Sequence, residues 1–115
     1  MKVLIASAEM SPLARTGGLG EAVAGLARAL AASGVTVTVV MPRYRHLFDL
    51  GTSREIAGVD VWEHAIGDVT VWLIDDPDAF DRDGIYGPQP GTGYDDQWSR
   101  FGTFSANLNR LSPGF

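Results

Sequence analysis

The sequence predicts an α/β fold built around one βαβ unit, and three observations support this prediction. Residues 2–7 form a short, mainly apolar run, residues 19–30 repeat apolar side chains at helical spacing, and residues 35–41 are almost entirely β-branched. A strand, a helix and a second strand within about 40 residues form a βαβ unit with parallel strands and a right-handed crossover. With 115 residues, the chain has room for one domain at most.

The elements of this unit follow from local patterns. Residues 2–7 lack polar alternation, as expected of a buried parallel strand. The helix is predicted from apolar residues three or four positions apart: Leu19, Val23, Leu26, Ala27 and Leu30. Gly34 is expected as its C-cap, because glycine readily adopts the left-handed conformation that ends helices. The second strand ends at Pro42, which has no backbone N–H to donate.

The chain after Pro42 has weaker patterns. Residues 59–63 and 69–74 are predicted strands, and the short segment between them favours a hairpin. Residues 75–96 are rich in Asp, Gly and Pro, and are expected to form a long surface loop with one helical turn at residues 77–80. A last helix is predicted over residues 96–111 from one apolar stripe: Trp98, Phe101, Phe104, Leu108 and Leu111.

These elements leave a parallel sheet without enough βα units to cover its faces and edges, so we expect the chain to be a fragment. It contains no cysteine, which excludes disulfides, zinc–thiolate sites and thiol nucleophiles. No apolar run is long enough for a membrane span. The first 47 residues carry five basic and two acidic side chains, and the remainder four and twelve. This balance disfavours nucleic-acid binding but allows the first part to attract a small anion.

No metal site is expected. His46 and His64 have no second ligand at metal-binding spacing. Two Asp-x-Asp triplets, residues 76–78 and 81–83, lack the downstream Glu of a calcium loop and are interpreted as solvated loop acids.

The glycine-rich segment between the first strand and the helix has the composition of an anion site. Gly17, Gly18 and Gly20 would let a phosphate approach the free N–H groups of the helix N-terminus, and Arg15 lies just upstream. The alternative is that the glycines only permit a tight turn and close packing of the helix on the sheet. A P-loop is excluded because Glu21 follows the last glycine where that motif requires Lys.

Other ligand assignments are weaker. A dinucleotide fingerprint is disfavoured because the glycines begin about ten residues after the strand instead of directly behind it. Arg43 and Tyr44 follow the second strand, where open α/β sheets place ligands, and are further candidates.

Several motifs together resemble a known family. Residues 7–12 (SAEMSP) and 15–21 (RTGGLGE) are similar to the N-terminal signature of bacterial glycogen synthases and plant starch synthases. Four later segments agree in the same order, namely residues 41–44 (MPRY), 73–75 (LID), 80–87 (FDRDGIYG) and 96–101 (DQWSRF). The resemblance extends over nearly the whole chain.

The resemblance implies that residues 1–115 are part of the Rossmann-like N-terminal domain of a two-domain GT-B glycosyltransferase. Such an enzyme transfers glucose, with retention, from ADP-glucose to the non-reducing end of an α-1,4-glucan, without a metal ion or other cofactor, in the bacterial cytoplasm or a plastid. By the same resemblance, Arg15 reaches the donor phosphates, Gly17 and Gly18 support them, and Glu9 and Tyr86 line the sugar pocket.

Three positions depart from the family pattern: Arg15 replaces Lys, Glu21 replaces Asp and Gln97 replaces Asn. The family's second domain and catalytic groups lie beyond Phe115, so we expect no catalytic residue within the chain and no activity from it alone. Two alternatives stay open. One is a related GT-B enzyme that uses another nucleotide sugar, and the other is a non-catalytic remnant that binds glucan or nucleotide.

Overall fold

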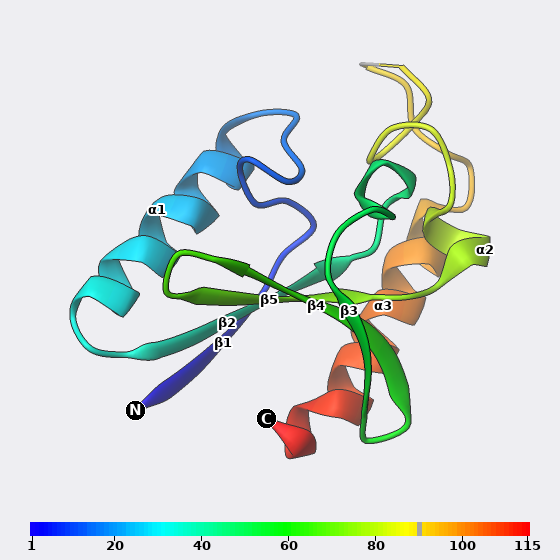
Figure 1. Cartoon of the computed structure of the whole chain (residues 1–115). Coiled ribbons are helices and arrows are strands. Elements are labelled where there is room, and N and C mark those ends of the chain that lie inside the picture. The colour runs from blue at the N-terminus through cyan, green and yellow to red at the C-terminus, as the bar shows by residue number, and fades with distance from the viewer. Residues whose placement is uncertain (90) are drawn as a thin grey trace.

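A computed structural model describes residues 1–89 and 91–115 and shows a five-stranded mixed sheet with helices on opposite faces (Figure 1). The elements are, in order, β1 (Lys2–Ala6), α1 (Gly18–Ala32), β2 (Thr36–Pro42), the 3-10 turn η1 (Arg45–Leu47), β3 (Thr52–Ile56), β4 (Val59–Ile66), β5 (Val69–Ile74), α2 (Pro77–Phe80), α3 (Gln97–Leu111) and the 3-10 turn η2 (Ser112–Gly114).

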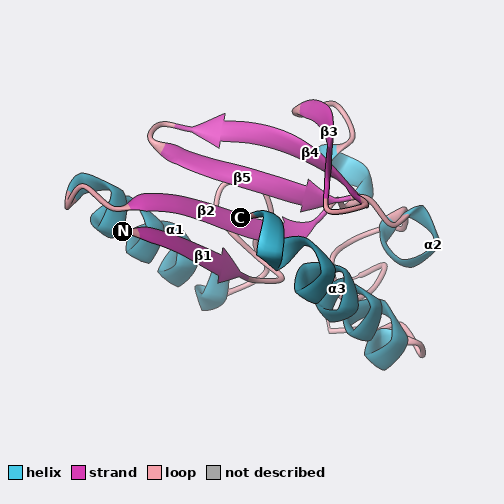
Figure 2. Ribbon diagram, turned by 90° about the horizontal axis from the view of Figure 1, so that it is seen from below, coloured by secondary structure: helices cyan, strands magenta, loops and turns pink. Residues whose placement is uncertain are grey.

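The strand order is β1-β2-β5-β4-β3 (Figure 2). β1, β2 and β5 run parallel, whereas β4 and β3 are antiparallel to their neighbours. The predicted βαβ unit is confirmed, since α1 connects the parallel pair β1 and β2. The expected burial of the first strand is wrong. In the described part of the chain β1 has a strand neighbour on one side only, and its side chains are half-buried or exposed.

Helix α1 lies close to the sheet because small residues form its contact face. Ala24 and Ala27 are completely buried, as are Val39 of β2 and Val71 of β5. The expectation that Leu19 and Leu26 belong to the buried face is wrong, since they are 48% and 53% exposed. The fully buried positions of α1 thus carry alanine, whose short side chain lets the helix backbone approach the sheet. Gly34 follows the helix with φ of +89°, as predicted for the helix end.

The predicted hairpin is confirmed, and β4 extends to Ile66. Gly67 and Asp68 form the two-residue turn to β5, with Gly67 at φ of +58°. Strand β3 was not predicted. Its first four residues are polar and exposed, and only Ile56 is buried, so it has no apolar alternation from which an edge strand could be recognised.

The helical turn α2 and the last helix α3 form where the sequence predicts them. α3 buries Arg100, Phe104 and Leu111, but not Trp98, which is 83% exposed. The assignment of Trp98 to the apolar stripe is therefore wrong. Positions two residues apart on an α-helix differ in direction by about 200°. Trp98 is two positions before the buried Arg100 and therefore lies on the opposite side.

Candidate functional site

Three connecting segments meet at the carboxyl ends of the parallel strands. Residues 7–17 follow β1, residues 43–51 follow β2, and residues 75–89 and 91–96 follow β5, and all three segments lie above the sheet in Figure 1. Open α/β sheets bind ligands at this edge. The predicted glycine segment and the predicted long loop are therefore brought to the same place.

Two adjoining hollows lie between these segments. One has a volume of about 690 Å³ and lies beside Ser11, Gly17 and His46. The other has a volume of about 530 Å³ and lies against Tyr86 and Gly87. Both are lined by Arg15, Thr16, Gly84 and Ile85. We call the combined depression the loop groove.

Packing explains some glycines of this region but not others. A Cβ on Gly20 would lie 3.0 Å from the Ala14 carbonyl oxygen, and one on Gly84, which has a φ of +70°, would lie 2.0 Å from the Gly87 oxygen. A Cβ on Gly17 or Gly18 would meet no described atom within 4 Å, and neither residue has a positive φ. The fold itself does not require glycine at 17 and 18, which favours ligand binding over the packing alternative for these two residues.

The N-terminus of α1 has the electrostatics expected of an anion site. Gly17 is the N-cap residue, so among the described residues no side chain caps the helix. The first N–H groups of a helix carry a partial positive charge of about half a unit. Arg15 stands beside them with its side chain 61% exposed and forms a 3.3 Å ion pair with the half-exposed Glu21. Exposed pairs of this kind are weak, so the guanidinium is able to exchange Glu21 for a phosphate.

Glu9 and Tyr86 are in direct contact. The Tyr86 hydroxyl donates a 2.6 Å hydrogen bond to the Glu9 carboxylate, which also accepts bonds from the backbone N–H (2.7 Å) and the hydroxyl (3.1 Å) of Thr16. Glu9 is only 3% exposed. Burial alone would raise the pKa of Glu9, but hydrogen bonds from Tyr86 and Thr16 and the backbone of Gly17 outweigh it and hold that pKa below its ordinary value.

This contact separates the roles of the two residues. Tyr86 is half-buried and lines the loop groove, whereas Glu9 lies behind it. Burial and the neighbouring Glu9 carboxylate raise the pKa of the Tyr86 hydroxyl, so it stays protonated. Because its proton is directed to Glu9, the phenol oxygen is left free to accept a hydrogen bond from a ligand hydroxyl.

Arg43 and Tyr44 are not brought into the groove. The Arg43 guanidinium lies between the rings of Phe48 (4.3 Å) and Trp62 (3.9 Å) and pairs with Asp75 at 3.1 Å. Tyr44 is fully buried, and its hydroxyl donates a 2.8 Å hydrogen bond to the Ala8 carbonyl, directly before Glu9. Tyr44 therefore supports the segment that carries Glu9 and is not available as a ligand group.

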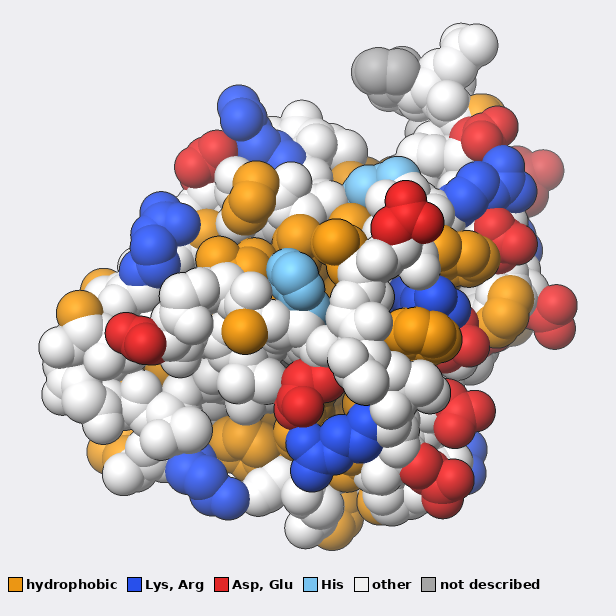
Figure 3. Space-filling view, viewed as in Figure 1, with side chains coloured by type: hydrophobic (Ala, Val, Ile, Leu, Met, Phe, Trp, Pro, Cys, Tyr) orange, Lys and Arg blue, Asp and Glu red, His pale blue; other side chains and the backbone are white. Residues whose placement is uncertain are grey.

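The long loop after β5 is held by three arginines. Arg45 donates to the side chains of Asp81 and Asp83, and Arg82 forms a two-pronged pair with Asp96 at 2.7 and 2.8 Å. Acidic side chains accordingly gather on the side of the molecule formed by α2 and the loop (right in Figure 3). The third arginine, Arg100, is buried. No sequence motif predicts its role, although a basic residue in register with the buried positions Phe104 and Leu111 is a signal that could have revealed one.

The described residues contain no group of three His, Asp or Glu side chains that could hold a metal ion. His46 instead contacts the Leu13 carbonyl oxygen at 2.8 Å. Among the residues whose structure is described, no helix has the length and apolar character needed to cross a membrane.

Comparison with known proteins identifies the family. The model of the starch synthase catalytic domain family matches residues 2–112. The chain belongs to this family. Glycogen synthase from Syntrophotalea carbinolica is 34% identical over 98% of the chain, and glycogen synthase 2 from Geobacter sulfurreducens is 38% identical over 94% of it. These alignments span 26% and 25% of the two relatives, so the chain covers about a quarter of their length.

A solved member of the starch synthase family shares the fold. The catalytic domain of starch synthase IV from Arabidopsis thaliana, bound to ADP and acarbose, superimposes with a TM-score of 0.69 at 28% identity. The match covers 96% of the chain and 24% of that structure. The predicted fold class, part of a Rossmann-like α/β domain of a GT-B glycosyltransferase, is confirmed. The roles of Arg15, Gly17, Gly18, Glu9 and Tyr86 stay predictions.

Proposed function

We propose that the protein is a retaining glucosyltransferase that moves glucose from ADP-glucose to the non-reducing end of an α-1,4-glucan, and that this chain forms one wall of its donor site. The observation that carries the proposal is the uncapped N-terminus of α1, where Gly17 and Gly18 leave open space beside Arg15. Support also comes from the bacterial relatives, which are named glycogen synthases, and from the ADP in the plant structure.

The geometry fits a diphosphate that becomes the leaving group. Gly17 and Gly18 let phosphate oxygens reach the backbone N–H groups that open α1, and Arg15 adds a planar pair of donors once it leaves Glu21. Both interactions strengthen as negative charge develops on the departing diphosphate, which lowers the barrier to transfer. Neither requires a metal ion, and we propose that none takes part, with no cofactor beyond the donor substrate.

The glucosyl unit would lie toward Tyr86. A sugar hydroxyl donates to the phenol oxygen of Tyr86, whose own proton stays on Glu9. Glu9 thus orients Tyr86 and Thr16 rather than touching the sugar itself. Transfer also needs groups that close the site from the other side, so the 115-residue chain alone is expected to be inactive. We place the enzyme in the bacterial cytoplasm, in keeping with its bacterial relatives.

Replacing Arg15 in the full-length native protein tests the proposal. In Arg15→Met, loss of charge-assisted hydrogen bonds should raise the KM for ADP-glucose about 10- to 100-fold. The matched control Arg28→Met removes the same charge from an exposed position on α1 and should leave KM unchanged. An unchanged KM in Arg15→Met would contradict the proposed phosphate contact.

Competition between donors tests the alternatives. If UDP-glucose displaces ADP-glucose at equal concentration, the protein is a related GT-B enzyme with another donor. Glucan binding without any transfer by the native protein would identify a non-catalytic binding protein. The intact mass of the native product is the companion measurement, since a mass close to 12.3 kDa would leave only half of the cleft and favour the binding protein over the enzyme.

A further inference from the structure

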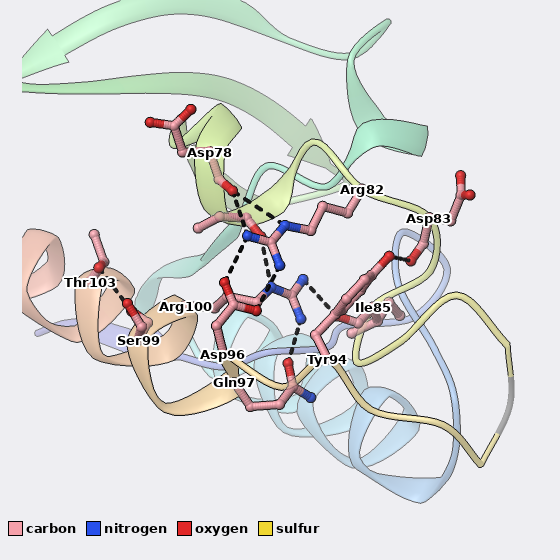
Figure 4. Close-up of polar contacts among 11 residues, drawn as sticks. Asp78, Arg82, Asp83, Ile85, Tyr94, Asp96, Gln97, Ser99, Arg100 and Thr103 are labelled. Carbon is pink, nitrogen blue, oxygen red and sulfur yellow. Dashed lines mark hydrogen bonds and ion pairs between the residues drawn. The ribbon is translucent and has the colours of Figure 1, made fainter.

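Arg100 is a buried cation held mainly by neutral groups. Its side chain, on the first turn of α3, is 1% exposed. Its guanidinium donates to the carbonyl oxygens of Ala79 (2.7 Å) and Ile85 (3.0 Å) and to the side-chain oxygen of Gln97 (2.5 Å). Figure 4 shows these contacts converging from α2, the long loop and α3. Within the described residues, no carboxylate lies at ion-pair distance from Arg100.

Packing alone does not account for a charge at this position. The guanidinium lies 4.7 Å from the ring centre of Tyr94, 5.1 Å from that of Phe80 and 5.5 Å from that of Phe101. Removal from water lowers the pKa of Arg100, which reflects the cost of burying it. Methionine would fill similar space among these rings without that cost. The specific contribution of arginine is its set of directed donors.

One N–H group of the Arg100 guanidinium bonds the residue directly before the groove residue Tyr86. The Ile85 carbonyl belongs to the peptide group that joins Ile85 to Tyr86, and the Tyr86 carbonyl accepts a 3.0 Å hydrogen bond from the Tyr94 N–H. Both peptide groups that flank Tyr86 are therefore fixed. The Tyr86 ring also lies 5.9 Å from that of Phe101, the residue after Arg100. Without these bonds the Ile85–Tyr86 segment would be free to shift, and a shift of the segment would move the Tyr86 hydroxyl relative to Glu9.

We propose that Arg100 is a positioning residue, which fixes the Ile85–Tyr86 peptide so that the Tyr86 hydroxyl stays on Glu9 and its ring forms a wall of the loop groove. The effect of Arg100 on glucosyl transfer rests on the proposed function, but its effect on Tyr86 does not. The competing interpretation is that Arg100 only ties α3 to α2 through Ala79 and contributes to stability.

Tyrosine NMR distinguishes the two interpretations in the full-length protein. Tyrosine is labelled with 13C at the hydroxyl-bearing carbon, and the signals of Tyr86 and Tyr44 are assigned by their Phe variants. In Arg100→Met, the Tyr86 signal should shift toward that of a water-exposed phenol, while Tyr44, bonded to the Ala8 carbonyl, should not shift. The matched control is Arg110→Met, an exposed arginine on the same helix. It should move neither signal.

Arg100→Lys is the second variant. It keeps the positive charge, so it can be measured if Arg100→Met does not fold. A lysine ammonium is a single point donor and cannot span both carbonyls, so an intermediate Tyr86 shift is expected. An unmoved Tyr86 signal in either folded variant, or equal shifts of Tyr86 and Tyr44, would overturn the proposal.

Enzyme kinetics then tests whether the position of Tyr86 affects glucosyl transfer. Relative to Arg110→Met, Arg100→Met should raise the KM for ADP-glucose at least tenfold. A KM equal to that of the control would overturn the role of Arg100 in donor binding. A wild-type protein without transfer activity would contradict the proposed function, while the Tyr86 signal would still decide the positioning role.

Discussion

At the scale of single residues, Glu9 shows how hydrogen bonds keep a buried carboxylate ionised. Two donors on Thr16 and one on Tyr86 converge on its oxygens and take the place of water. A carboxylate with several donors is stabilised in its charged form even where burial opposes charge. The same bonds join the segment after β1 to the loop after β5, so one side chain connects two walls of the groove.

Glu9→Gln should lower the free energy of unfolding by about 1–3 kcal/mol at pH 7, because the amide cannot accept all three hydrogen bonds. The pKa of Glu9 is lower in the folded chain than its ordinary value of 4.5. Its contribution is therefore complete above that pH and is lost as the pH falls through the folded-state pKa. Urea unfolding at several pH values should show the difference between wild type and variant shrinking below pH 4.5.

Glu55→Gln is the matched control for this experiment, since Glu55 is exposed on β3. Its stability should stay within about 0.5 kcal/mol of the wild type at neutral pH. A Glu9→Gln variant that is as stable as this control would show that the hydrogen-bond network around Glu9 contributes little.

At the scale of elements, the start of α1 and the loop after β5 use glycine for different purposes. Gly84 has a positive φ and no room for a Cβ, whereas Gly18 has neither constraint. Gly18→Ala should keep or raise stability by up to about 1 kcal/mol, because alanine restricts the unfolded chain. It should also weaken ADP-glucose binding at least tenfold, because a methyl group would stand where phosphate meets the backbone.

Gly84→Ala should have the opposite effect on stability. A marked loss is expected, because a Cβ at this position would lie 2.0 Å from the Gly87 oxygen. Thermal unfolding and donor titration of both variants provide the measurement. Loss of stability in Gly18→Ala, with unchanged donor binding, would mean that the helix and not a ligand needs glycine there.

At the scale of the whole molecule, burial decreases from the middle of the sheet to its edges. Val37, Val39, Val71 and Leu73 in β2 and β5 are at most 1% exposed, whereas every side chain of β1 is half-buried or exposed. Amide hydrogen exchange should therefore be slower in β2 and β5 than in β3. Uniform protection across all five strands would contradict this gradient.

The sequence predicts the parts of this fold that have strong periodicity or turn residues. The βαβ unit, the hairpin and the last helix are such parts. Burial at the sheet edge, the exposure of Leu19 and Leu26, and strand β3 depend on which elements become neighbours. Local sequence patterns do not contain that information.

The same holds for the site. Motifs single out Glu9 and Tyr86, but only folding reveals that they touch, 77 positions apart, and that Arg100 fixes the peptide between Ile85 and Tyr86.

The turn between β4 and β5 is a suitable place to attach a label to this protein. β2 and β5 are parallel, and Val69 at the start of β5 pairs with Val37 near the start of β2, so the preceding Gly67–Asp68 turn lies at the end of the sheet away from the groove. The chain has no cysteine of its own. A thiol introduced at the exposed Asp68 would be the only one in this chain and could carry a fluorophore or a surface tether, which would leave the groove open to ligands during single-molecule or immobilised measurements.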